Sequence, residues 1–195
     1  MARRLGHIDN SKPTDWEDMA AGPNHTLWFG DIGDNGETRS SISVVRVKEP
    51  RVIRNRTVKA TVFRLAYPDG AHNAEALMVR PRSGRVYVAT KSKTSGAVYR
   101  APKVLSPTGI NVMTKVLSGT PRGLSSADWR RDGKGFFLGG YTSIWVFDSF
   151  SSAPQVVPFA APVDFNEAAA WTRTGRAVSL TGEGTPKPVW LLRSN

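Results

Sequence analysis

Short runs rich in apolar and β-branched residues recur along the whole chain, separated by polar and turn-forming residues. Examples are Val86–Thr90, Ser143–Phe147 and residues 189–192. The 18 glycines and 13 prolines interrupt the chain at short intervals. No window of about 11–18 residues shows apolar positions at helical spacing. Many short strands joined by turns predict an all-β fold, which is a sandwich, a barrel or a propeller.

Four segments repeat one order of residue types, and this repetition decides among the three architectures. Each begins with a polar or acidic residue and a strand of small apolar residues, passes a glycine-containing turn, and continues into an aromatic or β-branched strand with a polar exit. The closest match pairs Trp129 with Trp171, each four residues before a turn glycine, Gly133 and Gly175. With a further β run before each segment, the pattern of four strands in about 40–58 residues is typical of a propeller blade.

The repeats predict a single β-propeller domain over residues 1–195, with four or five four-stranded blades in a closed or an incomplete ring. The blades are expected at about residues 4–49, 58–104, 111–149 and 155–193. The β runs at 61–66, 111–117 and 155–159 are assigned to the repeats that follow them. The outer strand of the first blade is then expected from residues 4–8 or 189–192.

Acidic and polar residues stand where the first strand of each repeat begins and where the second ends. In a propeller blade the first strand lines the central channel and the second returns beside it, so both points lie at one mouth of the channel. Seven of the 16 acidic residues fall between Asp9 and Glu37, although the formal net charge is +11. The residues expected at this mouth are Asp15, Glu17, Asp18, Asp31, Asp34, Glu75, Lys91, Ser125, Tyr141, Glu167 and Glu183.

Converging carboxylates raise one another's pKa unless a cation neutralises them, and calcium prefers carboxylate and carbonyl oxygens. Glu17, Glu75 and Glu167 are therefore candidate calcium ligands. An alternative is structural, with these acids accepting hydrogen bonds from backbone amides of neighbouring blades. The expected function is a binding or scaffolding propeller with an acidic pocket. The alternative function is a metal-dependent hydrolase of lactonase or phosphoesterase type, in which Asp15 or Asp18 is the general base.

The basic charge of the chain does not by itself indicate a partner. Seven basic residues lie between Arg46 and Arg64, but they occupy a connector and strand edges and are not interleaved with exposed aromatics, so nucleic acid is not favoured. A cation or small molecule at the mouth is the expected partner. No apolar run approaches the roughly 18–20 residues of a membrane helix. The start of the chain lacks the apolar stretch of a signal peptide, which indicates a cytoplasmic location by default.

The motifs at residues 15–20, 30–35, 74–77, 127–133 and 182–184 (Asp-Trp-Glu-Asp-Met-Ala, Gly-Asp-Ile-Gly-Asp-Asn, Ala-Glu-Ala-Leu, Ala-Asp-Trp-Arg-Arg-Asp-Gly and Gly-Glu-Gly) together resemble a family of actinobacterial β-propeller proteins with no assigned chemistry. Members are often exported, and they carry a signal peptide and at least one more blade before the first motif. The resemblance therefore implies an N-terminally shortened propeller with an incomplete ring, able to self-associate through an unpaired edge strand. More distantly, the acidic mouth resembles the metal-centred propellers of gluconolactonases and phytases.

Overall fold

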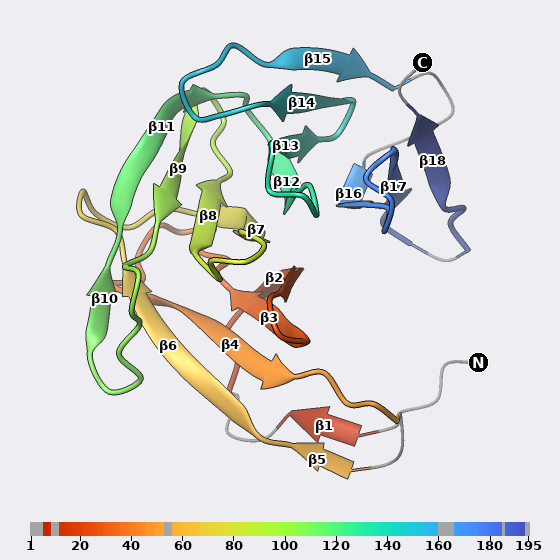
Figure 1. Ribbon diagram of the computed structural model, residues 1–195. Helices are drawn as coiled ribbons and strands as arrows, with labels where there is room; N and C mark the ends of the chain where they lie inside the picture. Colours follow the sequence, from red (N-terminus) through yellow and green to blue (C-terminus); the bar gives the residue numbers. More distant parts are fainter. Residues whose placement is uncertain (1–5, 9–11, 53–55, 160–165, 185, 194–195) are drawn as a thin grey trace.

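The computed structural model describes residues 6–8, 12–52, 56–159, 166–184 and 186–193. Every helix or strand assigned in these ranges is a β-strand, so the predicted all-β class is confirmed. The strands form four large sheets and one small pair. Figure 1 shows the four sheets arranged around one axis as the blades of a β-propeller.

The sheets follow one another along the chain. Blade 1 contains β2 (Trp16–Gly22), β3 (Thr26–Asp31), β4 (Ile42–Lys48) and β6 (Ala60–Ala66), with β10 (Ile110–Val112) parallel to β6. Blade 2 contains β7 (Ala74–Val79), β8 (Val86–Thr90), β9 (Gly96–Arg100) and β11 (Thr114–Thr120). Blade 3 contains β12 (Leu124–Trp129), β13 (Phe136–Gly140), β14 (Ser143–Phe147) and β15 (Gln155–Pro158). Blade 4 contains β16 (Asn166–Trp171), β17 (Ala177–Gly182) and β18 (Trp190–Arg193), and β1 (Gly6–Ile8) pairs with β5 (Arg56–Val58).

The hydrophobic core lies between the blades. One cluster joins blades 1 and 2, a second joins blades 2 and 3, and a third joins blades 3 and 4. Neighbouring residues of β7 serve different clusters, because Leu77 packs in the first and Met78 in the second. Both side chains are fully buried, and burial of each contributes about 1.5–3 kcal/mol. Packing of blade on blade is therefore the main source of stability.

As far as the structure describes the chain, the burial pattern of the inner strands shows that the arc of blades is open. All residues of β7 are buried because blade 2 is covered on both faces, whereas half-buried and exposed positions alternate along β16 after its buried first residue. The inner strands β2, β7, β12 and β16 contact one another in that order. Figure 1 shows blades 4 and 1 apart at the ends of the arc. The described residues of these two blades enclose a cleft of about 980 Å³, beside which Trp16 and Met19 are 40% and 56% exposed.

The strand pairings correct the predicted blade boundaries. The run at 61–66 lies in β6 and pairs antiparallel with β4 of blade 1, and β15 likewise pairs with β14 of blade 3. The fourth strand of these blades therefore completes the sheet of the strands before it instead of opening the next repeat. The predicted origin of the outer strand of blade 1 was also wrong. Of residues 4–8, the described part is β1, which pairs with β5, and residues 190–192 belong to blade 4.

Side chains of the inner strands form hydrogen bonds with the backbone of the next blade. The carboxyl group of Asp18 in β2 accepts the N–H of Leu77 in β7 at 2.8 Å, and Asp128 in β12 accepts the N–H of Trp171 in β16 at 2.9 Å. The hydroxyl of Ser125 donates to the carbonyl of Asn166 at 2.6 Å. The structural role expected for acids of the inner strands therefore belongs to Asp18 and Asp128.

We predict that Asp128→Ala lowers the free energy of unfolding by about 1–3 kcal/mol, because the N–H of Trp171 loses its acceptor in a half-buried site. Asp128→Asn keeps one acceptor oxygen and should cost less. Urea unfolding followed by tryptophan fluorescence measures both. The matched control is Asp148→Ala, an exposed aspartate of the same blade, which should change stability by less than about 0.5 kcal/mol. An equal decrease in the free energy of unfolding in Asp128→Ala and Asp148→Ala would contradict a stabilising role of the hydrogen bond between Asp128 and Trp171.

Candidate functional site

Each inner strand contains a β-bulge near its start. The register shifts between Trp16 and Asp18 in β2, and the other three inner strands shift at the equivalent point. A bulge leaves the extra residue outside the ladder and redirects its side chain. The four extra residues are Glu17, Glu75, Ser125 and Glu167. We call the end of the channel where these residues lie the acidic mouth.

The three glutamates interact electrostatically. Burial raises the pKa of Glu17 to about 7, with further contributions from the charges of Glu75, Asp15 and Glu167. Burial also raises the pKa of Glu167, with contributions from Glu75 and Glu183. The structure thus brings together the three glutamates that the sequence predicted at the mouth. Glu183, on the exposed loop between β17 and β18, contributes charge from the edge.

Asp15 and Glu17 face each other across Gly33. A Cβ atom at Gly33 would lie 2.3 Å from Oδ2 of Asp15 and 2.4 Å from Oε1 of Glu17. Only glycine leaves room for two carboxylates at this point. Gly33 is a site residue that the sequence did not single out, because its role depends on a contact between the loop after β3 and the start of β2.

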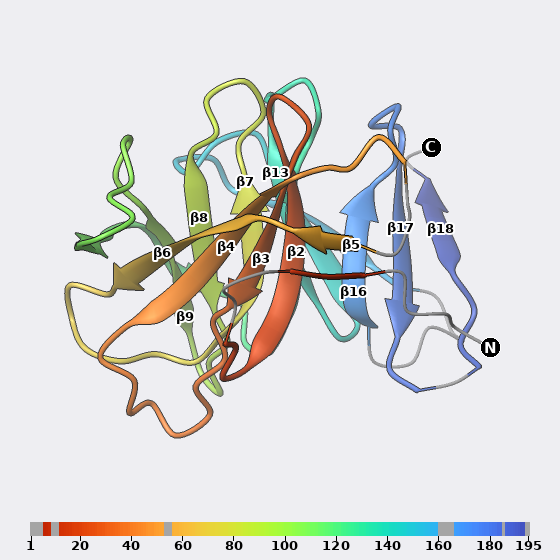
Figure 2. The same cartoon turned by 90° about the horizontal axis from the view of Figure 1, so that it is seen from below.

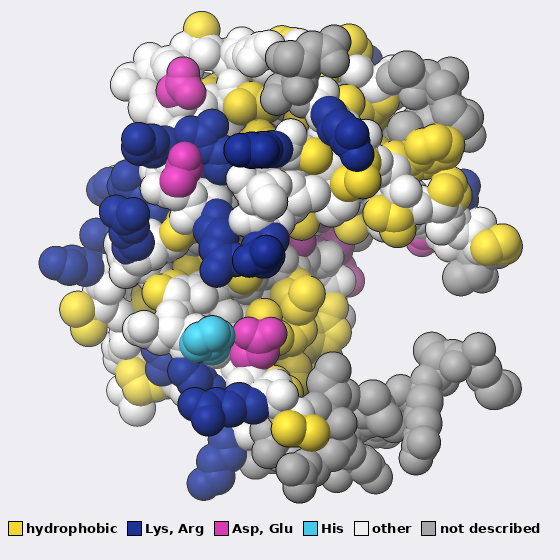
Figure 3. All heavy atoms as spheres, turned by 45° about the vertical axis from the view of Figure 1, so that its right-hand side comes forward, with side chains coloured by type: hydrophobic (Ala, Val, Ile, Leu, Met, Phe, Trp, Pro, Cys, Tyr) yellow, Lys and Arg dark blue, Asp and Glu magenta, His cyan; other side chains and the backbone are white. Residues whose placement is uncertain are grey.

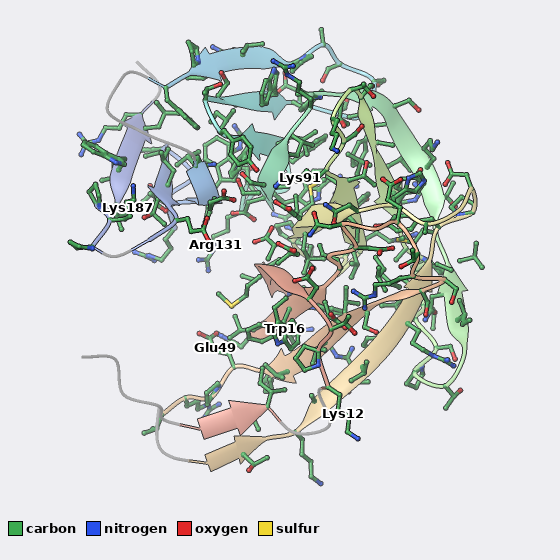
Figure 4. The ribbon with its side chains drawn as sticks, turned by 180° about the vertical axis from the view of Figure 1, so that it is seen from behind. Lys12, Trp16, Glu49, Lys91, Arg131 and Lys187 are labelled. Atoms are coloured by element: carbon green, nitrogen blue, oxygen red, sulfur yellow. The ribbon has the colours of Figure 1, made fainter. Side chains whose placement is uncertain are left out.

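Lys91 is the cation at the centre of this group. Its Nζ lies 2.6 Å from Oε2 of Glu75 and 5.1 Å from the ring centre of Tyr141. Burial by itself lowers the pKa of Lys91, but its bonds to Glu75 and Tyr141 outweigh this effect and raise the pKa well above its ordinary value. Figure 4 labels Lys91 near the axis, where the inner strands converge. Glu75 is therefore neutralised, whereas Glu17 and Glu167 form no ion pair with a residue that the structure describes.

Asp31 and Asp34 hold the loop that follows β3. Asp31 accepts the backbone N–H groups of Thr14 and Asp15 and forms an ion pair with Arg39 at 3.1 Å. Asp34 accepts the N–H groups of Thr38 and Arg39. Both side chains are buried, and these donors occupy their oxygens. Asp31 and Asp34 therefore stabilise the loop beside the acidic mouth, and their oxygens are poorly placed to bind a ligand there.

The buried amide of Asn73 is a second supporting residue that sequence analysis missed. Its Oδ1 accepts the N–H of Asp34 at 2.8 Å, and its amide nitrogen donates to Asn35. The start of blade 2 is thereby tied to the loop of blade 1. A single asparagine in a loop carries no distinguishing pattern in the sequence.

Asp18 lies below the mouth, between the inner strands. It accepts the N–H groups of Met19 and Leu77, but burial outweighs these bonds and raises its pKa to about 8. A carboxyl group that keeps its proton at neutral pH is a poor general base. Of the two candidate bases named from the sequence, Asp18 is thus engaged in joining blades, and Asp15 remains at the mouth.

The mouth continues into a cavity of mixed charge. This cavity, of about 960 Å³, lies among the loops of blades 1, 2 and 3, and its lining includes Lys91, Lys93, Arg122, Glu37 and Tyr141. Within the described ranges, no three His, Asp or Glu side chains are placed to hold a metal ion. Calcium coordination by Glu17, Glu75 and Glu167 stays a prediction. No helix long and apolar enough to cross a membrane occurs in the described part of the chain.

No family model matches the sequence, and no curated protein matches it. Among solved structures, hydrazine synthase of Kuenenia stuttgartiensis is similar, with a TM-score of 0.54 and 14% identity over 95% of this chain and 48% of that chain. Sqt1 of Chaetomium thermophilum gives a TM-score of 0.49 at 14% identity, over 95% of this chain and 45% of that chain. The Dos1 propeller gives a TM-score of 0.49 at 14% identity, over 94% of this chain and 59% of that chain. The chain thus spans about half the length of the structures it matches. This likeness concerns the fold alone, and the actinobacterial family stays a prediction.

We predict that stability falls as pH rises through the titration of Glu17. Its pKa is about 7 in the folded protein and near 4.5 when unfolded, so the folded state binds more protons between these values. The free energy of unfolding therefore decreases between about pH 4.5 and 7. Glu17→Gln should make this decrease shallower in urea unfolding measured at several pH values. Glu37→Gln, which removes an exposed acid from the neighbouring loop, is the control. An identical pH dependence of the free energy of unfolding in wild type and Glu17→Gln would show that the pKa of Glu17 is not raised in the folded protein.

Proposed function

We propose that this protein is a binding propeller whose acidic mouth holds the cationic group of a small ligand. The observation that supports the proposal is that Glu17 is a partly buried carboxyl group without a paired cation in the described part of the chain. Its pKa is raised to about 7 because it is partly buried among other acids, with no paired cation among the described residues. An incoming cation would replace the proton on Glu17 and relieve its repulsion with Asp15 and Glu167.

The donor set favours an organic cation over a calcium ion. Carboxylate oxygens suit calcium, but calcium needs about six to eight oxygen ligands. Oε2 of Glu75 is engaged by Lys91, and the three-acid geometry of a metal site is absent from the described residues. An ammonium or guanidinium group needs fewer acceptors, and Asp15 and Glu17 face each other across Gly33 at a suitable place.

We predict that spermidine, used as the probe cation, binds the folded protein and releases protons from Glu17. Isothermal titration calorimetry at pH 7, in two buffers of different ionisation enthalpy, measures the number of protons released. Wild type should release a fraction of one proton per bound cation, and Glu17→Gln should release fewer. Calcium chloride is titrated in parallel, and weaker binding of calcium than of spermidine is expected.

The controls separate the mouth from general charge attraction. Glu49→Gln removes an exposed acid that is not part of the mouth, and should bind spermidine like the wild type. Glu17→Gln and Glu167→Gln should each weaken binding. If Glu49→Gln weakens binding as much as they do, or if no protons are released, the proposal fails. If calcium binds with proton release and spermidine does not, the metal site predicted from the sequence replaces it.

A further inference from the structure

The turns between the first and second strands of all four blades project to one face of the molecule. Figure 2 shows the turns after β2, β7, β12 and β16 together along the upper edge. We call this surface the hairpin face, made of residues 23–25, 80–85, 130–135 and 172–176. It lies opposite the acidic mouth, since the inner strands begin at the mouth and end at these turns.

Blades 3 and 4 present the same pair of cations from the same turn. The N–H of Arg130 bonds to the carbonyl of Gly135 at 2.9 Å, and the N–H of Thr172 bonds to the carbonyl of Ala177 at 2.8 Å. Each bond encloses four residues, of which the first and last are basic. The enclosed pairs are Arg131 with Lys134 and Arg173 with Arg176.

Cations also lie in the turn of blade 2 and beside the turn of blade 1. In blade 2, the N–H of Arg80 bonds to the carbonyl of Arg85, and Arg82 stands between them at a φ of 65°. In blade 1, Nζ of Lys48 donates to the carbonyl of Asn24 and so lies beside the turn after β2. Every blade therefore places at least one cation on or beside the hairpin face.

Few acids balance these cations. The hairpin face and Lys48 together hold nine basic residues, and among the residues that the structure describes the acids within or beside them are Glu49, Asp132 and Asp148. Asp132 is paired with Arg130 at 2.9 Å. The exposed side chains of Arg82, Arg131, Arg173 and Arg176 form no ion pair with a described residue. Figure 3 shows Lys and Arg side chains gathered over one face with few acidic side chains among them.

We propose that the hairpin face binds the phosphate backbone of double-stranded nucleic acid without reading its sequence. Arginine pairs with phosphate through two parallel hydrogen bonds, and a duplex carries about one negative charge per 1.7 Å of its axis. The four turns carry no Phe, Tyr or Trp side chain on which an unstacked base could stack, and His25 is the one aromatic ring among them, which disfavours a single strand. They also carry no large apolar side chain that could enter a lipid bilayer.

The experiment measures fluorescence anisotropy with two labelled duplexes of unrelated sequence, titrated with the protein between about 50 and 200 mM salt. The two duplexes should bind equally. The logarithm of the association constant should fall linearly with the logarithm of the salt concentration. The triple variant Arg131→Gln/Arg173→Gln/Arg176→Gln should reduce this slope by about 0.9 for each arginine that contacts a phosphate.

A second triple variant controls for net charge. Lys93→Gln/Arg122→Gln/Lys187→Gln removes the same charge from exposed loops on the side of the mouth, and should bind the duplexes almost like the wild type. Replacing the three arginines of the hairpin face by lysine should retain most of the binding. Circular dichroism checks that every variant is folded.

Three results would overturn the proposal. Equal weakening by the two glutamine triples would mean that net charge alone is responsible. Binding to heparin without binding to the duplex would assign the face to an acidic polysaccharide. Sedimentation with vesicles of anionic lipid, without duplex binding, would assign it to a membrane surface.

Discussion

The structure depends on the burial of each blade against its neighbours, and only a blade with a neighbour on each face is buried completely. Blade 2 meets this condition, and its strands β7 and β8 are buried along their whole length. Inner strands that pack so closely leave no water for their backbone groups, so side chains of the preceding blade must supply hydrogen-bond partners. Asp18 and Asp128 do this for Leu77 and Trp171. Bringing carboxylates into this position raises their pKa, to about 8 for Asp18 and about 6 for Asp128, mainly through burial.

The same packing creates the acidic mouth. Because every inner strand has its bulge at the equivalent place, convergence of the blades also converges the bulged residues. Three of the four are glutamates, and only Glu75 has a cation partner among the residues described, namely Lys91. Lys91 also lowers the pKa of Glu17 and Glu167, so one half-buried cation partly balances three acids. The mouth retains an excess of negative charge in a protein whose net charge is +11.

The sequence was informative wherever the repeat itself carried the signal. Glu17, Glu75 and Glu167 could be placed at one mouth because each occupies the same position in its repeat. The fourth strand could not be assigned to the correct blade, since the run at 61–66 has the same composition whichever neighbour it pairs with. Asp31 and Asp34 resembled ligands, but they bind the backbone of their own loop and Arg39, which only the fold reveals. The hairpin face was missed because its cations are about 50 residues apart in sequence and gather only when the blades assemble. Self-association and the location of the protein stay predictions.

The open side of the arc connects the mouth to the stability of the two end blades. Glu17 belongs to blade 1 and Glu167 to blade 4, yet the charge of Glu167 raises the pKa of Glu17 across the opening. Trp16 and Met19 of blade 1 and Val189 beside blade 4 are largely exposed along the same cleft, so apolar burial would favour bringing the two ends together. The repulsion between the two glutamates opposes this approach. A cation shared by Glu17 and Glu167 would remove this repulsion, so binding of the cation would favour closure of the arc. Because such coupling is reciprocal, closure of the arc would strengthen cation binding by the same free energy.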